Sequence, residues 1–496
     1  MNPALDYHAL APAIILVATI AVALLADLIW PDLQGSRTPR IASLGVVAAF
    51  VPVISLALDG TDRAMFGGAF VIDNYALAFE ALFLAATYIT LLMSFDYIAE
   101  GDYYQSEYYV LMLTSVLGML VMSSARDLIT IFVALETISI PTFVLAGWRK
   151  HDTKSNEAAI KYFLIGVISS AIMLYGMSLV YGLSGSTLLT EIARAMSGAN
   201  GTDPKPLLVV AMFLTLVGFA FKMSSVPFHF WTADTYEGAP TPVTAFLSVA
   251  SKAGGFVGAL TIVSVAFAHH GDIAAWVPVQ WAIWAMAVAS MTLGNLVALR
   301  QTNIVRMLAY SSIAQGGFIL VPLAVLGSNV DTHEAANTIQ AVVIYLFIYA
   351  AMNLGTFAVV IAVARRTNSG EINSYSGLGR TDPVMAVLMT GFMISLAGVP
   401  PVAGWFAKFV MFRAALTANT TAGVIIAAVA AVNSVIAFFY YAGVIRRMWF
   451  HEPISERSTL STPAALTTAI ALCAAATLVV GVYPQVLARV GELAKF

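Results

Sequence analysis

The chain has 496 residues, of which 60% are hydrophobic and only 10% are charged, with 24 Lys and Arg against 27 Asp and Glu. A soluble protein carries about 25% charged residues, so the composition excludes a soluble enzyme. The net charge of −3 gives no reason to expect nucleic-acid binding, and the single Cys473 excludes a disulfide framework or a Cys-ligated iron–sulfur cluster.

Apolar runs long enough to cross a membrane recur along the whole chain. A spanning helix needs about 20 such residues, because hydrocarbon offers the backbone no hydrogen bonds. The pattern therefore predicts an all-α, polytopic membrane protein with about fourteen transmembrane helices. In chain order these segments are residues 10–30, 41–58, 75–98, 108–125, 128–148, 158–183, 207–231, 243–268, 276–299, 304–326, 336–364, 384–416, 423–449 and 464–490.

Basic residues are distributed unevenly between the loops that join these segments. Twelve Lys and Arg residues lie in the odd-numbered loops and only four in the even-numbered loops. Basic loops stay in the cytosol. We therefore expect a multi-pass membrane protein with both termini on the outer side of the membrane.

Two predicted segments resemble each other and indicate an internal repeat. Segment six contains AIMLYG at 171–176, and segment eleven contains AAMNLG at 350–355. An offset of five segments reverses the direction of the chain, so the pattern predicts two inverted five-helix repeats, as in many transporters. The predicted division is an N-terminal three-helix segment, a first repeat of helices 4–8, a second repeat of helices 9–13 and a C-terminal helix 14, at residues 1–106, 107–269, 270–450 and 451–496.

Two segments contain proline where a continuous helix would need a backbone donor. Segment seven contains KMSSVP at 222–227, and segment twelve contains AGVPPVAGWFAK at 397–408. Proline removes a hydrogen bond and clashes with the preceding turn, so we expect helices seven and twelve to be broken within the membrane. Broken helices at matching places in two halves are typical of an ion pathway. The alternative is a packing kink without a transport role.

Three lysines fall deep inside these segments. The chain has only eight lysines. At 1.5 Å per residue, Lys222 and Lys252 lie roughly 14 Å from the cytosolic end of their segments, and Lys408 lies roughly 12 Å from the outer end. Lysine, unlike arginine, can readily take up and release a proton when it is buried. We therefore interpret these three lysines as candidate proton carriers.

Other ionisable residues fall near the same path. Glu136 is the deepest acid, and we expect it to form an ion pair with Lys222 that switches the proton affinity of the lysine; a static structural pair is the alternative. Lys161 lies near a segment end and could reach water. His229 follows Pro227 and could connect the lysines to water, or it could be an ordinary interfacial histidine. Asp27 and Glu80 are further candidates for burial. No spacing of histidines suggests haem or zinc.

The sequence from Lys222 to Thr244, KMSSVPFHFWTADTYEGAPTPVT, continues as AFLSVASKAGGF through Lys252. Together with Glu136 upstream and VPPVAGWFAKF around Lys408, it resembles the antiporter-like membrane subunits of respiratory complex I, the bacterial NADH-quinone oxidoreductase, and among them the N type. The resemblance covers nearly the whole chain. It implies proton translocation through two half-channels, driven by electron transfer in other subunits of the complex.

The resemblance also implies a role for each candidate residue. Glu136 and Lys222 would serve the first half-channel, Lys252 the central relay and Lys408 the second half-channel, with Lys161 and His229 as auxiliary relay groups. Tyr310 stands where the second repeat would need an acid matching Glu136, so the two half-channels cannot work identically.

The resemblance implies no cofactor and no metal in this chain itself; NADH, FMN, iron–sulfur clusters and quinone would be bound by other subunits. The expected partners are other antiporter-like and small membrane subunits of the complex and the lipid bilayer, with no nucleic acid. The rival interpretations are a subunit of a multisubunit cation/proton antiporter without redox chemistry and a non-conducting scaffold.

Overall fold

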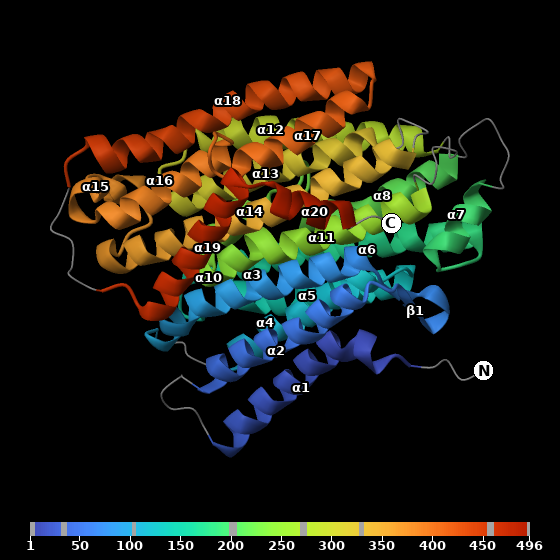
Figure 1. Cartoon of the computed structure of the whole chain (residues 1–496), viewed down its shortest axis with the longest axis horizontal. Helices are drawn as coiled ribbons and strands as arrows, with labels where there is room; N and C mark the ends of the chain where they lie inside the picture. Colours follow the sequence, from blue (N-terminus) through green and yellow to red (C-terminus); the bar gives the residue numbers. More distant parts are fainter. Residues whose placement is uncertain are drawn as a thin grey trace.

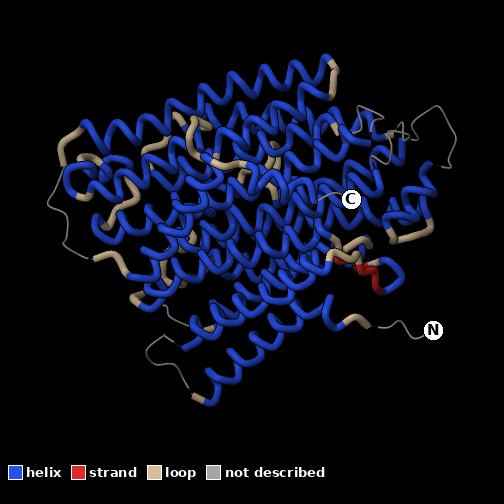
Figure 2. The backbone as a smooth tube through the Cα atoms, in the orientation of Figure 1, coloured by secondary structure: helices blue, strands red, loops and turns tan. Residues whose placement is uncertain are grey.

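The computed structural model describes residues 5–30, 37–101, 106–197, 206–267, 275–326, 332–453 and 461–493. Across these ranges the chain is helical almost throughout, and the helices lie side by side in one bundle (Figures 1 and 2). Twelve described helices are long and apolar enough to cross a membrane. Two shorter apolar helices, Pro206–Lys222 and Pro383–Ala397, lie at the proline-containing segments. The chain is therefore a polytopic all-α membrane protein.

The N-terminal part forms one edge of the bundle, with α1 and α2 outermost (Figure 1). Its helices are α1 (Tyr7–Ile29), α2 (Arg37–Asp59) and α3 (Asn74–Ala99). Between α2 and α3 lies a small antiparallel hairpin of β1 (Arg63–Met65) and β2 (Phe70–Ile72). Sequence analysis missed this hairpin, because three-residue strands carry too little alternation to be recognised.

The first half of the remaining chain follows the N-terminal part in the bundle. Its elements are α4 (Glu107–Ser124), α5 (Leu128–Ala146), α6 (Thr153–Ser184), α7 (Leu189–Ser197), α8 (Pro206–Lys222), α9 (Trp231–Gly238), α10 (Thr241–Phe246), η2 (Leu247–Ser251), α11 (Lys252–Ile262) and η3 (Val263–Phe267). Elements α10 to η3 form one continuous helix in which η2 and η3 are π-helical turns.

The second half lies on the other side of the bundle, with α18 at the far edge from α1 (Figure 1). Its elements are α12 (Trp276–Ala298), α13 (Ile304–Val325), α14 (Thr332–Thr367), η5 (Ile372–Tyr375), α15 (Leu378–Thr381), α16 (Pro383–Ala397), α17 (Gly404–Thr417), α18 (Thr421–Phe450), α19 (Ala464–Val482) and α20 (Gln485–Leu493). The predicted boundary between the repeats, 269/270, lies outside the described residues.

Helix starts are set by short polar side chains that satisfy the first free backbone N–H groups. Asp152, for example, accepts a hydrogen bond from the N–H of Lys154, so α6 begins at Thr153 and not at the predicted residue 158. The same kind of cap begins α1, α3, α5, α13, α16 and α18, at Asp6, Asp73, Asp127, Asn303, Asp382 and Thr420.

Three predicted segments are each divided into two helices. Segment seven is α8 and α9, separated by residues 223–230, and segment twelve is α16 and α17, separated by residues 398–403. The predicted segment 464–490 is wrong at its end, because α19 stops at Val482 and α20 begins after Pro484. Proline cannot continue the hydrogen-bond ladder of a helix.

Candidate functional site

Lys222 is the last residue of α8, directly before the break, and only 2% of it is exposed. Its Nζ donates hydrogen bonds to Ser139 Oγ of α5 and to the Tyr162 hydroxyl of α6, both at 3.0 Å. Gly255 of α11 lies against its stem, where a Cβ would approach Lys222 Cβ to 2.9 Å. Helices α5 and α6 therefore bind the ammonium group, and α11 packs against the stem of the same lysine.

The break after Lys222 leaves backbone N–H and C=O groups without helical hydrogen-bond partners. Such unsatisfied groups are costly inside a membrane. Side chains satisfy several of them. The indole of Trp231, at the start of α9, donates to the carbonyl of Phe221 at 3.3 Å, and the N–H of Val226 donates to Ser290 Oγ at 2.9 Å. The break is thus a defined structure supported by α9 and α12.

Glu136 lies on α5 and is partly buried. Its Oε1 accepts a hydrogen bond from Ser170 Oγ of α6 at 2.5 Å. The expected direct ion pair with Lys222 is not formed: no nitrogen of Lys222 lies within 4.0 Å of the Glu136 carboxylate. Ser139, the partner of Lys222, follows Glu136 by three residues, or about 4.5 Å along the axis of α5. The acid faces α6, and the ammonium contacts the next turn of α5.

Lys252 begins α11, directly after the π-helical turn η2, and 1% of it is exposed. Its Nζ donates to two oxygens of Ser312 in α13, the main-chain carbonyl at 2.8 Å and Oγ at 2.6 Å. Among the described residues, no carboxylate lies within 4.0 Å of this ammonium. Irregular helical turns are frequent at functional sites, because they redirect side chains and free carbonyls.

Lys408 lies on α17, just after the second break, and is 6% exposed. Its Nζ donates to the carbonyl of Ala397, the last residue of α16, at 2.7 Å, and lies 4.9 Å from the ring centre of Phe318. Helix C-termini and aromatic faces both favour cations. Gly398 has φ +86, and a Cβ there would approach Lys408 Cδ to 2.5 Å, so this position needs glycine for both its backbone and its space.

Helix α13 connects the surroundings of Lys252 and Lys408. Ser312 binds Lys252, and Gln315 lies one turn further along α13. The Gln315 amide donates to the carbonyl of Leu396 at 3.1 Å, and Tyr345 donates to Gln315 Oε1 at 2.6 Å. Leu396 precedes Ala397, which binds Lys408. Neighbouring residues of α13 thus contact Lys252 and the end of α16, where Lys408 is bound.

Aromatic rings form a second set of contacts, which leads from Lys222 to Ser312. Tyr162, which binds Lys222, stacks on Trp231 with ring centres 4.3 Å apart. Trp231 contacts Tyr236 edge-on at 6.3 Å, and the Tyr236 hydroxyl lies 3.4 Å from Ser312 Oγ. The contacts that lead from Lys222 therefore reach Lys252 at Ser312, whereas those around Lys408 reach α13 one turn away, at Gln315.

Lys161 lies outside this buried row. Its side chain is 42% exposed, and its Nζ pairs with Glu157 and with Asp234 of α9, both at 2.6 Å. Asp234 also pairs with Arg306 of α13 at 2.9 Å, and Glu237 pairs with Arg306 at 2.8 Å and Lys154 at 2.9 Å. This ion network ties α9 to α6 and α13.

Burial raises the pKa of Asp234, but hydrogen bonds from Lys161 and Arg306 outweigh it and hold the pKa below its usual value. Burial also raises the pKa of Glu237. Hydrogen bonds from Arg306 and Lys154 have the larger combined effect, so the pKa of Glu237 is below its usual value. Both acids are therefore charged at neutral pH and keep the network intact.

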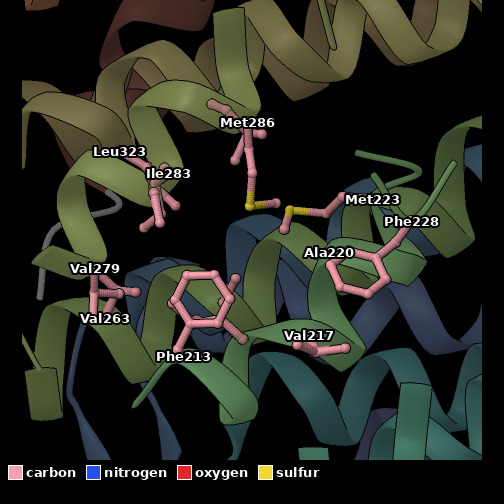
Figure 3. Close-up of a pocket in the computed structure, with 14 residues that line it drawn as sticks. Phe213, Val217, Ala220, Met223, Phe228, Val263, Val279, Ile283, Met286 and Leu323 are labelled. Atoms are coloured by element: carbon pink, nitrogen blue, oxygen red, sulfur yellow. The ribbon is translucent and has the colours of Figure 1, made fainter. Parts of the chain in front are cut away.

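His229 is buried in the first break, and its Nδ1 has no hydrogen-bond partner among the described residues. A cavity of about 30 Å³ lies beside the same break, lined by side chains of α8, α11, α12 and α13. Figure 3 shows the thioether of Met286 directed toward that of Met223 across it. The lining is apolar, and an apolar cavity of this kind stays dry, so it provides no water path to Lys222.

The two remaining acids differ in their surroundings. Asp27 is half-buried and accepts a hydrogen bond from Ser106 Oγ, whereas Glu80 of α3 is almost fully buried. Within the described residues, no three His, Cys, Asp or Glu side chains are grouped so as to hold a metal ion.

The partners of the lysines were not predicted from the sequence: Ser139 and Tyr162 for Lys222, Ser312 for Lys252, the Ala397 carbonyl for Lys408 and Asp234 for Lys161. None stands out in the sequence, because serines and tyrosines are ordinary in membrane helices and their partners lie 60 or more residues away. Asp234 and Glu237 could have been found, since two acids one turn apart directly after an apolar segment predict a charged helix face.

Residues 125–434 match the family model described as NADH:quinone oxidoreductase/Mrp antiporter, TM. The chain is 37% identical over 492 residues to NADH-quinone oxidoreductase subunit N of Trichlorobacter lovleyi, covering 99% of this chain and 97% of that one. A chain of respiratory complex I from Thermus thermophilus has a similar structure, with a TM-score of 0.78 and 29% identity over 98% of this chain and 100% of that one. A chain of the Mrp complex from Dietzia sp. shares the fold, with a TM-score of 0.83 and 22% identity over 99% and 97% of the two chains.

Proposed function

Because the chain belongs to the membrane-protein family of NADH:quinone oxidoreductases and Mrp antiporters, we propose that it is a proton-translocating subunit of a membrane NADH:quinone oxidoreductase. In this function Lys222, Lys252 and Lys408 carry protons in turn through two half-channels. Electron transfer takes place in partner subunits, which hold NADH, FMN, iron–sulfur clusters and quinone. The complex lies in the bacterial inner membrane, with both termini of this chain on the outer side.

The surroundings of the three buried lysines are the main support for this proposal. Three lysines are buried in the interior of a membrane protein, each at a helix break or an irregular turn, and each is held by neutral oxygens. A buried ammonium without a carboxylate beside it is costly. Its charge is therefore readily gained and lost when nearby charges move, which is what a proton carrier requires.

In this mechanism Glu136 affects Lys222, because the acid lies one turn of α5 from the point where Lys222 contacts that helix. A carboxylate turned toward Lys222 would favour the charged form of the lysine. With the carboxylate on Ser170, as in the structure, that support is weaker and release of the proton is favoured. Lys161 and His229 serve as auxiliary groups that exchange protons with water at the cytosolic end.

A cation/proton antiporter subunit without redox chemistry is the second candidate, and the fold shared with the Mrp chain favours it. Purification in mild detergent distinguishes the two. We expect the chain to co-purify with subunits that oxidise NADH and reduce quinone, and membrane vesicles to take up protons on addition of NADH. An assembly of membrane subunits alone, with Na⁺-driven proton movement, would support the antiporter instead.

A further inference from the structure

Asn353 is a buried amide of α14 that the contacts of the three lysines do not include. Only 1% of it is exposed. Its side-chain N–H donates to Ser248 Oγ of η2 at 2.8 Å, and α14 packs against η2. A polar side chain inside a membrane protein is costly unless a partner satisfies it. The hydrogen bond to Ser248 therefore fixes where this amide lies in the bundle.

The similar stretch in the first half of the chain has no amide at this place. AAMNLG at 350–355 and AIMLYG at 171–176 align Asn353 with Leu174. Leu174 lies on α6, and 48% of it is exposed at the surface of the bundle. An apolar side chain therefore suffices at this position in one stretch, and the other stretch carries an amide that contacts η2.

Ser248 connects the amide to the backbone at the start of η2. Its hydroxyl accepts from Asn353 and donates to the carbonyl of Ala245 in α10 at 2.8 Å. Ala245 lies two residues before η2 begins, and η2 ends directly before Lys252. A short chain of hydrogen bonds thus leads from α14 into the π-helical turn that precedes the lysine.

The π-helical turn η2 sets the direction of Lys252. A π turn contains one residue more than an α turn, and it is the rarer form. Each residue of an α-helix rotates the side chain by about 100°, so a regular helix in place of η2 would rotate Lys252 relative to α10 by about that angle. The ammonium would then point away from Ser312, whose two oxygens it contacts at 2.8 and 2.6 Å.

Helix α14 is itself held in place next to Asn353. The thioether of Met352 accepts a hydrogen bond from Ser395 Oγ of α16 at 3.4 Å. The same hydroxyl accepts from the N–H of Gly404 at 3.0 Å, on the far side of the second break. A group that directs another side chain must be supported by its own neighbours, and these contacts support this part of α14.

We propose that Asn353 is a positioning residue for Lys252: through Ser248 it stabilises η2 as a π-helical turn and so keeps the ammonium of Lys252 on Ser312. The proposal rests on the proposed function of Lys252 as a proton carrier. No proton passes through Asn353, which acts only through the geometry of η2. Without the amide, η2 relaxes toward a regular helix and Lys252 turns away from Ser312.

The test measures the ratio of protons moved to electrons transferred in membrane vesicles that contain the whole complex. Asn353→Leu replaces the amide by an apolar side chain of similar size, and Ser248→Ala removes the other side of the same hydrogen bond. Asn433→Leu is the matched control, because Asn433 is a buried asparagine of α18 that donates to Thr292 of α12. We expect the first two variants to lose part of the proton yield per electron and the control to retain it. Normal ratios in both would overturn the proposal.

The pH profile of the same ratio separates positioning from a loss of packing. Asn353→Leu and Ser312→Ala both weaken the contact of Lys252 with Ser312, so we expect the two variants to change the profile in the same direction. A profile of wild-type shape in Asn353→Leu would mean that the amide supports only the packing of α14. If Asn353→Leu does not assemble, the ratio and the pH profile of Ser248→Ala decide.

Two further variants complete the test. The double variant Asn353→Leu with Ser248→Ala should lose no more proton yield than Asn353→Leu alone, because both changes remove one hydrogen bond. Additive losses would show that Asn353 does not act through Ser248. Lys252→Ala separates the two proposals: normal pumping there rejects the proton-carrier function itself, whereas lost pumping there with normal ratios in Asn353→Leu and Ser248→Ala rejects only the role of Asn353.

Discussion

The ammonium of Lys252 donates to both the main-chain carbonyl and the hydroxyl of Ser312, so a lysine from the first half of the chain is bound by a helix of the second half. On the Lys222 side, the Tyr236 hydroxyl also contacts this serine. On the Lys408 side, the Leu396 carbonyl accepts from Gln315, one turn further along α13. A change of charge on Lys252 therefore acts on both halves of the chain, and this would couple the two half-channels that we propose.

Ser312→Ala removes one of the two oxygens that bind Lys252. A hydrogen bond to a charged group contributes about 1.5–3 kcal/mol, so the charged form of Lys252 loses stabilisation of that size. We expect a lower ratio of protons to electrons with normal assembly. The matched control is Ser178→Ala on α6, whose hydroxyl donates to its own helix. Equal ratios in the two variants would show that Ser312 does not act on the lysine.

Tyr162→Phe removes the hydroxyl that binds Lys222 and keeps the ring that stacks on Trp231. Since packing is preserved, we expect the complex to assemble, to lose less thermal stability than Tyr162→Ala and to move fewer protons per electron. Tyr162→Ala removes the ring as well, and loss of a buried aromatic side chain costs about 3–5 kcal/mol. If Tyr162→Phe and Tyr162→Ala behaved alike in both measurements, the hydroxyl would have no role of its own.

Glu136→Gln keeps a hydrogen-bonding group opposite Ser170 but removes the charge. Because we propose that Glu136 acts on Lys222 through its charge, we expect proton movement to weaken more than assembly. The measurements are the ratio of protons to electrons and the amount of assembled complex on a native gel. A normal ratio would count against the interaction between Glu136 and Lys222.

Asp234→Asn weakens the ion network that fixes α9. Partly exposed ion pairs contribute about 1 kcal/mol or less each, so we expect a small fall in melting temperature at neutral pH. The pKa of Asp234 is lowered in the folded protein, so its contribution is fully present above the ordinary carboxyl pKa of 3.8 and is lost as the pH falls through the lower folded value.

The difference in melting temperature between wild type and Asp234→Asn should therefore be constant from neutral pH down to about pH 5 and should shrink in stronger acid. Glu371→Gln provides a control, because Glu371 is an exposed acid at the start of η5. A difference that stayed constant to the lowest pH would mean that Asp234 stabilises α9 by something other than its charge.

Much of the fold could be predicted from sequence, for physical reasons that act locally. Long apolar runs require helices in hydrocarbon, and counting residues at 1.5 Å each placed Lys222, Lys252 and Lys408 deep in the protein, where they are buried. The end of α19 was missed although Pro484 marks it, because the apolar run continues past the proline.

The partners of the lysines could not be predicted, because they depend on how distant helices meet. Charge alone suggested that Lys222 should contact Glu136, yet the ammonium lies between Ser139 and Tyr162. The direction in which Glu136 points is decided by a serine of α6 that no local pattern marks. The sequence could identify the ionisable groups, and only the tertiary packing decides which of them contact neutral oxygens.

The most direct test of proton carriage by the buried lysines is the ratio of protons moved to electrons transferred in vesicles containing Lys222→Ala or Lys252→Ala. Lys150→Ala, which changes an exposed lysine in the loop between α5 and α6, is the control. We expect the first two variants to oxidise NADH but to move fewer protons per electron than the control. Normal ratios in both, in fully assembled complexes, would contradict it and leave the chain a non-conducting scaffold.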